Sequence, residues 1–246
     1  MLNLILVETA LEIVPSRYRG HPSVLNNAKK FGNPGRILDI ALHHSFMKNL
    51  PDNEKRGRPD ILHQYLLSCL TSPINKQKQL RMYFHTYDDN VYEVNPILRP
   101  PKDYIRYKGL MYQLLNEKKI QAIKTPVKNS QESQNSSSNN HGNILMNNIR
   151  VNLRGLIKML NPEKILRFTS KGTLISQNEI FNFLKNGTAE IIALIGGFQS
   201  GTYSKEIMEI DAEDISIYPE PLETNAVINR VIINYENAIM NFPNKG

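Results

Sequence analysis

Continuous apolar runs alternate along the chain with segments in which apolar residues recur at helical spacing. The segments 2–7 and 190–195, apolar except for Asn3 and Glu190, predict strands that are buried on both faces of a parallel sheet. Shorter apolar runs predict strands at 165–168 and 215–218. Helical spacing predicts helices over residues 36–50, 59–72, 104–119, 152–160, 179–185 and 225–240. Strands that alternate with helices indicate an α/β fold with a parallel sheet.

The middle of the chain departs from this alternation. Residues 80–86 and 91–94 predict a hairpin of two strands, because Asp88-Asp89-Asn90 supplies turn residues between them. Residues 17–35 are rich in Gly, Pro and Asn and predict a loop with one short helix at most. Residues 128–143 are rich in Ser, Asn and Gln, so a disordered surface loop is predicted there. We expect it to interrupt a single domain that spans residues 1–246.

Composition narrows the class of protein. The 246 residues are 40% hydrophobic, which is enough to bury a substantial core. No apolar run approaches the roughly 18 residues that a membrane span needs, so no membrane association is expected. The single cysteine, Cys69, excludes an internal disulfide framework and a cysteine-rich zinc site, and its helical position predicts a buried, inert thiol. A reducing, intracellular setting follows.

Charge points to a polyanionic partner or, equally, to a solvated basic surface. The chain carries 30 Lys and Arg against 23 Asp and Glu, a net charge of +7. The cations Arg99, Lys102 and Arg106 lie before and in the first turn of a predicted helix, where they oppose the helix dipole unless an anion sits there. Tyr104 and Tyr107 are interleaved with them and suit base stacking. This segment is either an RNA-binding surface or an ordinary solvated face.

Arg58 and Asp60 form the second candidate site. Arg58 suits bidentate phosphate contact, and Asp60 could act as a base, orient Arg58 or cap the helix that begins at Pro59. From the residues alone, a structural helix cap paired with an arginine is favoured. Asp39 and His43 share a helix face four residues apart, but no third ligand has a plausible spacing, so no metal is expected.

A glycine-rich segment follows the predicted strand at 190–195. Its glycines, Gly196, Gly197 and Gly201, lack the spacing of a dinucleotide fingerprint. A glycine loop at the carboxyl end of a parallel strand is nevertheless where an α/β sheet holds ligands. A ligand site and a tight turn both remain open.

Four stretches taken together resemble one known family. They are Ala41-Leu-His-His-Ser45, then Lys55-Arg-Gly-Arg-Pro-Asp-Ile61 with His63, then Asn95-Pro96 with the run from Arg99 to Leu115, and finally Ile195-Gly196, Gly201, Ile215-Ser216 and Pro221-Leu222. The chain resembles the pseudouridine-N1 rRNA methyltransferases of ribosome biogenesis, the essential-for-mitotic-growth family of the SPOUT class. The likeness covers nearly the whole chain outside residues 128–143. The Arg-Gly-Arg-Pro-Asp and Gly-Leu-Met-x-Gln-Leu-Leu blocks are its most specific parts.

The resemblance implies a parallel-sheet SPOUT fold with a C-terminal trefoil knot, an architecture that patterning alone does not suggest. It also implies a homodimer and S-adenosyl-L-methionine as the cofactor, held mostly by the backbone of three loops. Carried over to this chain, the cofactor-binding positions are Thr169, Gly196, Gly197, Gly201, Thr202, Tyr203, Leu222, Glu223, Thr224, Asn225, Ala226 and Val227.

The same resemblance implies the substrate, N1 of a pseudouridine in small-subunit rRNA. The RNA-binding positions fall on Arg58, Arg99, Lys102 and Arg106, and the catalytic candidates are Asp60 and Arg58. A base must leave its stack to reach a buried methyl donor, and N1 must lose its proton to act as nucleophile. Further implications are a ribosomal protein as a partner and a location that is cytoplasmic in an archaeon or nucleolar in a eukaryote.

Three departures and two rival functions accompany the resemblance. Lys102 stands where the family usually has Arg, Pro100-Pro101 replaces a single proline after an aliphatic residue, and the turn at 218–222 is longer than the usual one. One rival is an RNA-binding ribosome assembly factor in which methylation is secondary or absent. The other is a different SPOUT activity, on uridine or on a ribose.

Overall fold

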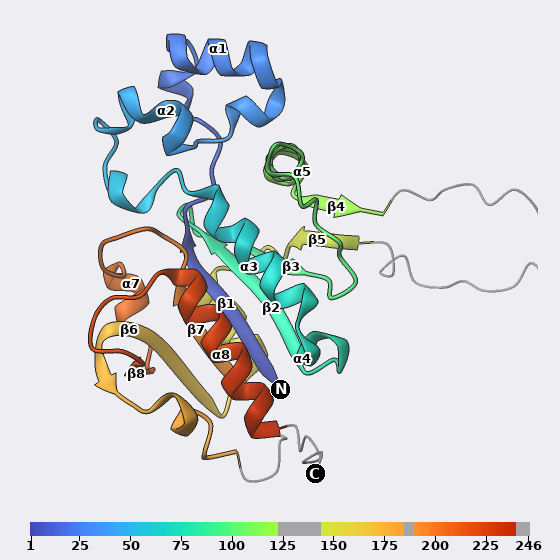
Figure 1. Ribbon diagram of the computed structural model, residues 1–246. Coiled ribbons are helices and arrows are strands. Elements are labelled where there is room, and N and C mark those ends of the chain that lie inside the picture. The colour runs from blue at the N-terminus through green and yellow to red at the C-terminus, as the bar shows by residue number, and fades with distance from the viewer. Residues whose placement is uncertain (123–143, 185–188, 240–246) are drawn as a thin grey trace, which may run out of the picture.

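The computed structural model describes residues 1–122, 144–184 and 189–239. The loop predicted at 128–143 lies outside the described residues. Within them the strands form one eight-stranded sheet in the order β4-β5-β3-β2-β1-β7-β6-β8 (Figure 1). The strands are β1 (Leu2–Thr9), β2 (Leu80–Thr86), β3 (Val91–Val94), β4 (Lys119–Gln121), β5 (Ile144–Asn148), β6 (Lys164–Leu174), β7 (Ile191–Gly196) and β8 (Glu213–Ser216).

The sheet is mostly parallel, as predicted, with an antiparallel end. Strands β2, β1, β7, β6 and β8 run parallel to one another, and β2 and β3 form the predicted antiparallel hairpin. Every residue of β1 is buried, which confirms a strand covered on both faces. Its even-numbered Leu2, Leu4 and Leu6 belong to one core, while Ile5 and Val7 belong to another on the opposite face.

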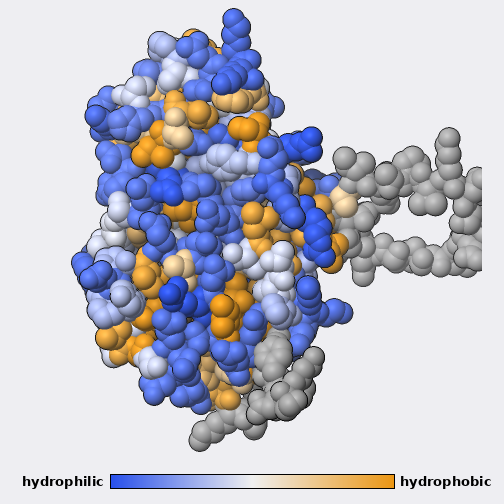
Figure 2. Space-filling model, viewed as in Figure 1, coloured by the Kyte–Doolittle hydropathy of each residue, from blue (hydrophilic) through white to orange (hydrophobic). Residues whose placement is uncertain are grey.

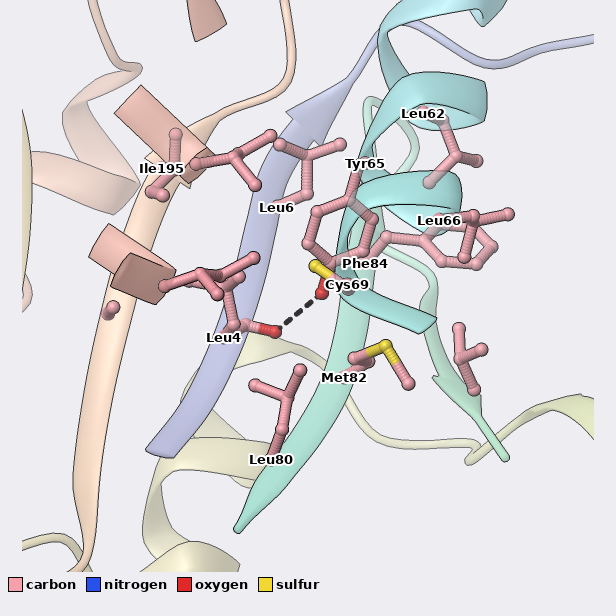
Figure 3. Packing of buried hydrophobic residues seen from close by; sticks show 14 of the residues in the cluster. Leu4, Leu6, Leu62, Tyr65, Leu66, Cys69, Leu80, Met82, Phe84 and Ile195 are labelled. Carbon is pink, nitrogen blue, oxygen red and sulfur yellow. Dashed lines mark hydrogen bonds between the residues drawn. The ribbon is translucent and has the colours of Figure 1, made fainter. Parts of the chain in front are cut away.

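Helices cover both faces of the sheet. On one face lie α3 (Pro59–Thr71), α4 (Pro73–Lys76), α5 (Tyr104–Glu117) and α8 (Thr224–Ile239), whose apolar side chains share the larger core. The other face carries α6 (Leu153–Leu160) and α7 (Lys205–Met208). Tyr65 of α3 donates its hydroxyl to the carbonyl oxygen of Leu4 at 2.8 Å (Figure 3). The same hydroxyl lies 3.1 Å from the carbonyl oxygen of Tyr83, so one side chain joins α3 to two strands. Cys69 is fully buried as predicted, and burial raises the pKa of its thiol.

An extension stands between β1 and α3, at the top of Figure 1. It contains α1 (Pro22–Phe31), α2 (Ile40–Met47) and a small core of its own around Phe46 and Leu38. His21 caps α1 and Gly32, at φ 68°, ends it, so the one short helix predicted within 17–35 is present. The helix predicted at 36–50 begins only at Ile40, because Asp39 accepts from the backbone N–H of Ala41 and caps it there.

Other predicted helices and strands had wrong boundaries or were absent, and two strands were missed. The helix predicted over 179–185 is a short 3-10 turn, Gln177–Glu179, followed by turns in which Ile180 and Phe181 are buried. The strand predicted at 215–218 is displaced to Glu213–Ser216. Strands β4 and β5 were not predicted. No helix in the described parts of the chain is long and apolar enough to cross a membrane.

Candidate active site

A cavity of about 560 Å³ lies at the carboxyl ends of the parallel strands β6, β7 and β8, where the following loops begin. This is the edge at which open α/β sheets hold ligands. Strand β6 loses its register with β8 between Phe168 and Thr173, so residues 169–172 leave the ladder as an excursion before pairing resumes. The excursion, the loop after β7 and the turn after β8 together line the cavity.

Eight of the twelve predicted cofactor positions line this cavity. They are Thr169, Gly196, Gly201, Thr202, Tyr203, Leu222, Thr224 and Val227. The three loops are tied to one another by hydrogen bonds. Thr224 donates its hydroxyl to the carbonyl oxygen of Gly196 at 2.9 Å, and the Tyr203 hydroxyl donates to the carbonyl oxygen of Phe168 at 2.7 Å. Burial raises the pKa of Tyr203, so this phenol stays protonated and donates.

The two adjacent glycines of the β7 loop differ in their surroundings. Gly196 faces the cavity, whereas Gly197 packs on β1, where a Cβ would lie 2.8 Å from the Cα of Thr9 and 2.9 Å from the Cγ of Leu6. Gly197 also exchanges backbone hydrogen bonds with Val7 and Ala10. The structure therefore places Gly197 behind the loop rather than on the cavity surface.

A second hollow of about 510 Å³ adjoins the first, with Thr224 in the lining of both. It receives the predicted positions outside the cavity lining, Glu223, Asn225 and Ala226, together with Arg58 and Asp60. The first turns of α3 and α8 meet here (Figure 1). The hollow thus brings the catalytic candidates next to the third cofactor loop.

Arg58 and Asp60 form a bidentate ion pair. The Nε of Arg58 donates to Oδ1 of Asp60 at 2.8 Å and its Nη2 donates to Oδ2 at 2.7 Å. This hydrogen bonding is the main reason that the pKa of Arg58 is raised. Asp60 makes no capping hydrogen bond to α3, whose N-cap residue is Arg58. Of the structural roles considered, pairing with Arg58 is observed and capping is not.

The predicted RNA-binding cations gather near this pair. Arg99, Lys102 and Arg106 are all exposed, and Asp103 caps α5 by accepting from the backbone N–H of Arg106. A ring nitrogen of His63 lies 2.7 Å from the carbonyl oxygen of Pro101, so the segment 99–103 is held against the start of α3.

The interleaved tyrosines are structural. Tyr107 is fully buried and stacks on His63, and its hydroxyl donates to the carbonyl oxygen of Pro59. Tyr104 is half-buried and donates to Asp39 at 3.0 Å. Asp39 also accepts from buried Lys108 at 2.8 Å, so its carboxylate serves this network. The described residues contain no group of three metal-ligating side chains.

Glu8 and Lys55 lie beside the cavity, and the sequence motifs assigned neither of them a role there. Both are buried, and Lys55 Nζ lies 3.0 Å from one carboxylate oxygen of Glu8. The other oxygen accepts from the backbone N–H of Ser204, and the Lys55 ammonium lies over the Phe198 ring at 5.0 Å. This buried pair therefore joins the end of β1, the loop before Arg58 and the cavity loop after β7. Its sequence signals are a carboxylate that directly follows a buried strand and the place of Lys55 at the start of the Lys55–Ile61 block.

Together the fold and the site define an α/β enzyme with a ligand cavity at the carboxyl edge of a parallel sheet, beside a basic surface. The chain belongs to the EMG1/NEP1 methyltransferase family, whose model matches residues 4–236. The family resemblance drawn from the motifs is confirmed.

Relatives and a solved structure agree with this assignment. The Ribosomal RNA small subunit methyltransferase Nep1 of Staphylothermus marinus is 37% identical over 239 residues, which cover 96% of this chain and 95% of that protein. The protein of the same name from Saccharolobus solfataricus is 36% identical over 98% of this chain and 99% of its own length. The crystal structure of Archaeoglobus fulgidus Nep1 bound to S-adenosylhomocysteine matches with a TM-score of 0.78 and 29% identity, covering 96% of this chain and 97% of that one.

Proposed function

We propose that this protein transfers a methyl group from S-adenosyl-L-methionine to small-subunit rRNA. The observation that carries the proposal is the cavity that the loops after β6, β7 and β8 build beside the Arg58–Asp60 pair and the exposed cations. Family membership supports methyl transfer, and the names of the relatives support rRNA as the substrate. The structural neighbour holds S-adenosylhomocysteine, the product of such a transfer.

The cavity fits S-adenosyl-L-methionine in size and in chemistry. About 560 Å³ falls within the range of pockets for ligands of this kind. Backbone groups of residues 196–203 would hold the polar parts of the cofactor. Apolar side chains of the cavity lining, those of Ile195, Leu222 and Val227, would contact its apolar parts. Bound there, the cofactor supplies an electrophilic methyl group on a sulfonium centre.

The acceptor that we propose is N1 of a pseudouridine. Arg58 and Asp60 stand where a base taken out of its stack would approach across Thr224, the residue shared by the two hollows. Asp60 would take the N1 proton while the ring nitrogen bonds the methyl group. The bond between the methyl group and sulfur would break in the same step, with S-adenosylhomocysteine as the leaving group. Arg58 would hold the flanking phosphate and keep the carboxylate oriented toward the ring. Arg99, Lys102 and Arg106 would bind the phosphates around the target loop.

The remaining implications of the resemblance belong to the same proposal. They are a trefoil knot closed by the segment that leads into α8, a homodimer, a ribosomal protein as partner, and a cytoplasmic or nucleolar location set by the source. The hydrogen bond between Thr224 and Gly196 supports close packing of that segment on the β7 loop. Light scattering of the purified chain tests the dimer.

The decisive experiment offers labelled S-adenosyl-L-methionine and two hairpins that differ only in uridine or pseudouridine at the target position. Methylation of the pseudouridine hairpin alone is expected. Transfer to uridine or to a ribose would indicate another SPOUT activity. Tight binding of both hairpins with no transfer by folded protein would overturn the proposal in favour of an RNA-binding assembly factor.

A further inference from the structure

The extension carries a concentration of cations that the site described above does not use. Residues 13–38, here named the basic extension, contain no Asp or Glu and five Lys or Arg, against a net charge of +7 for the whole chain. All five are exposed, and they are Arg17, Arg19, Lys29, Lys30 and Arg36. Figure 2 shows hydrophilic side chains along the outer edge of this region.

Folding accounts for only part of this charge. Lys29 and Lys30 lie in the last turn of α1, where cations favour the helix dipole. Arg17, Arg19 and Arg36 lie outside α1. Arg17 and Arg36 lie in short 3-10 turns, whose dipoles are much smaller than that of α1, and Arg19 lies in no helix. Within the described parts of the chain, none of the five has a carboxylate oxygen within 4.0 Å, although ion pairs occur elsewhere in the molecule. Unneutralised cations at this density attract a polyanion.

The basic extension is fixed in place relative to the RNA-binding cations. Helix α5, which carries Arg106, packs on the short turn Asn33–Arg36, and Gly109 faces the Pro34 ring there. The buried bond between Lys108 and Asp39 ties α5 to the start of α2. Because the two basic surfaces share these contacts, one rigid partner can lie across both.

A hollow of about 250 Å³ lies between the basic extension and α5. Its lining combines exposed Arg19 and Arg36 with buried Val14 and Val24 and with Tyr112 of α5. Two guanidinium groups at the rim of one hollow suit bidentate contact with backbone phosphates. An acidic protein surface would engage the same cations, but RNA is the polyanion that the proposed function already places at the neighbouring cations of α5.

We propose that the basic extension binds the phosphate backbone of the RNA stem that adjoins the target loop. This inference rests on the proposed function, because it takes RNA as the substrate. Each phosphate neutralised contributes about 0.7–0.9 to the slope of log affinity against log salt concentration. The extension would therefore add affinity for long RNA without touching the reacting base.

The test uses the triple variant Lys29→Gln, Lys30→Gln, Arg36→Gln and two RNAs, a minimal target hairpin and the same hairpin with a lengthened stem. For the long RNA we expect a salt slope shallower by about two to three, and affinity at about 0.1 M salt reduced tenfold or more. Binding of the minimal hairpin, and methyl transfer at saturating RNA, should stay within twofold of the unaltered protein.

A matched control removes the same charge elsewhere, by Lys76→Gln, Lys158→Gln, Lys205→Gln, at exposed positions on α4, α6 and α7. Equal slopes for the two triple variants on long RNA would overturn the proposal, because net charge would then explain the effect. Absence of methyl transfer by the unaltered protein would defeat the proposed function alone, since the slopes are measured by binding.

Discussion

The buried Glu8–Lys55 pair offers the sharpest test of how the cavity is held together. Replacing Glu8 by Gln keeps the shape of the side chain and an oxygen that can accept from Ser204. It removes the negative charge and leaves the Lys55 ammonium buried beside Phe198. The side chains of Glu8 and Lys55 are only 8% and 11% exposed, so water compensates little. We expect a loss of about 2–4 kcal/mol in the free energy of unfolding.

The loss should also reach the cofactor, because Ser204 and Phe198 belong to the segment around the cavity loop. If about 1 kcal/mol of the loss falls on loop position, the affinity for S-adenosylhomocysteine drops about fivefold. Urea unfolding gives the first quantity and calorimetric titration the second. Glu209→Gln is the matched control, because it breaks a pair with Arg154 whose side chains are 52% and 56% exposed, worth at most about 1 kcal/mol. Equal unfolding losses for the two variants, with unchanged affinity for S-adenosylhomocysteine, would refute the reasoning.

Three further outcomes follow from the site and the core. Asp60→Asn should lower single-turnover methyl transfer by about 10²–10⁴-fold while cofactor affinity, measured by calorimetry, stays within twofold; full turnover by the folded variant would exclude a base role. Gly197→Ala places a Cβ 2.8 Å from the Cα of Thr9 and should cost about 1–3 kcal/mol in urea unfolding, and a neutral effect would contradict the packing described. Burial lowers the pKa of His43 to about 4 from 6.5, so the unfolded chain binds more protons between these values. Stability should therefore fall as pH drops from about 6.5 towards 4, and His43→Phe should reduce that dependence in pH-resolved unfolding curves.

Much of the sheet is predictable because its central strands have almost uninterrupted apolar sequences. Residues 2–7 are apolar except for Asn3, residues 191–195 are all apolar, and the structure buries both segments. Strands β4 and β5 escaped prediction because they are short, lie at the end of the sheet and include polar residues such as Gln121 and Asn147. The helix predicted at 179–185 was wrong although the segment contains apolar residues at helical spacing. Its apolar Ile180 and Phe181 fill the core from turns, and spacing alone does not separate that arrangement from a helix.

Some residues of the candidate site can be identified from local sequence, and others only from contacts between segments that are distant in the chain. Local chemistry identifies Arg58 with Asp60, since neighbours on one short segment can pair without knowledge of the fold. The sequence does not distinguish the adjacent glycines Gly196 and Gly197. Their roles differ because Gly197 packs closely against Thr9 of β1. The contact of Glu8 with Lys55 spans 47 residues, so no local motif encodes it.

The excursion of β6 at residues 169–172 separates the residues that line the cavity from the residues whose pairing with β8 fixes the packing of the core. Pairing with β8 holds through Phe168 and resumes at Thr173, so the ladder is complete on both sides of the departure. Thr169, Ser170 and Lys171, which line the cavity, can therefore change in size without shifting the alignment of the side chains that fill the core. Gly172 is the fixed point of the excursion, because a Cβ there would lie 2.6 Å from the backbone of β8. Within one lineage the pocket can be retuned toward new ligands while the scaffold inherits its packing unchanged.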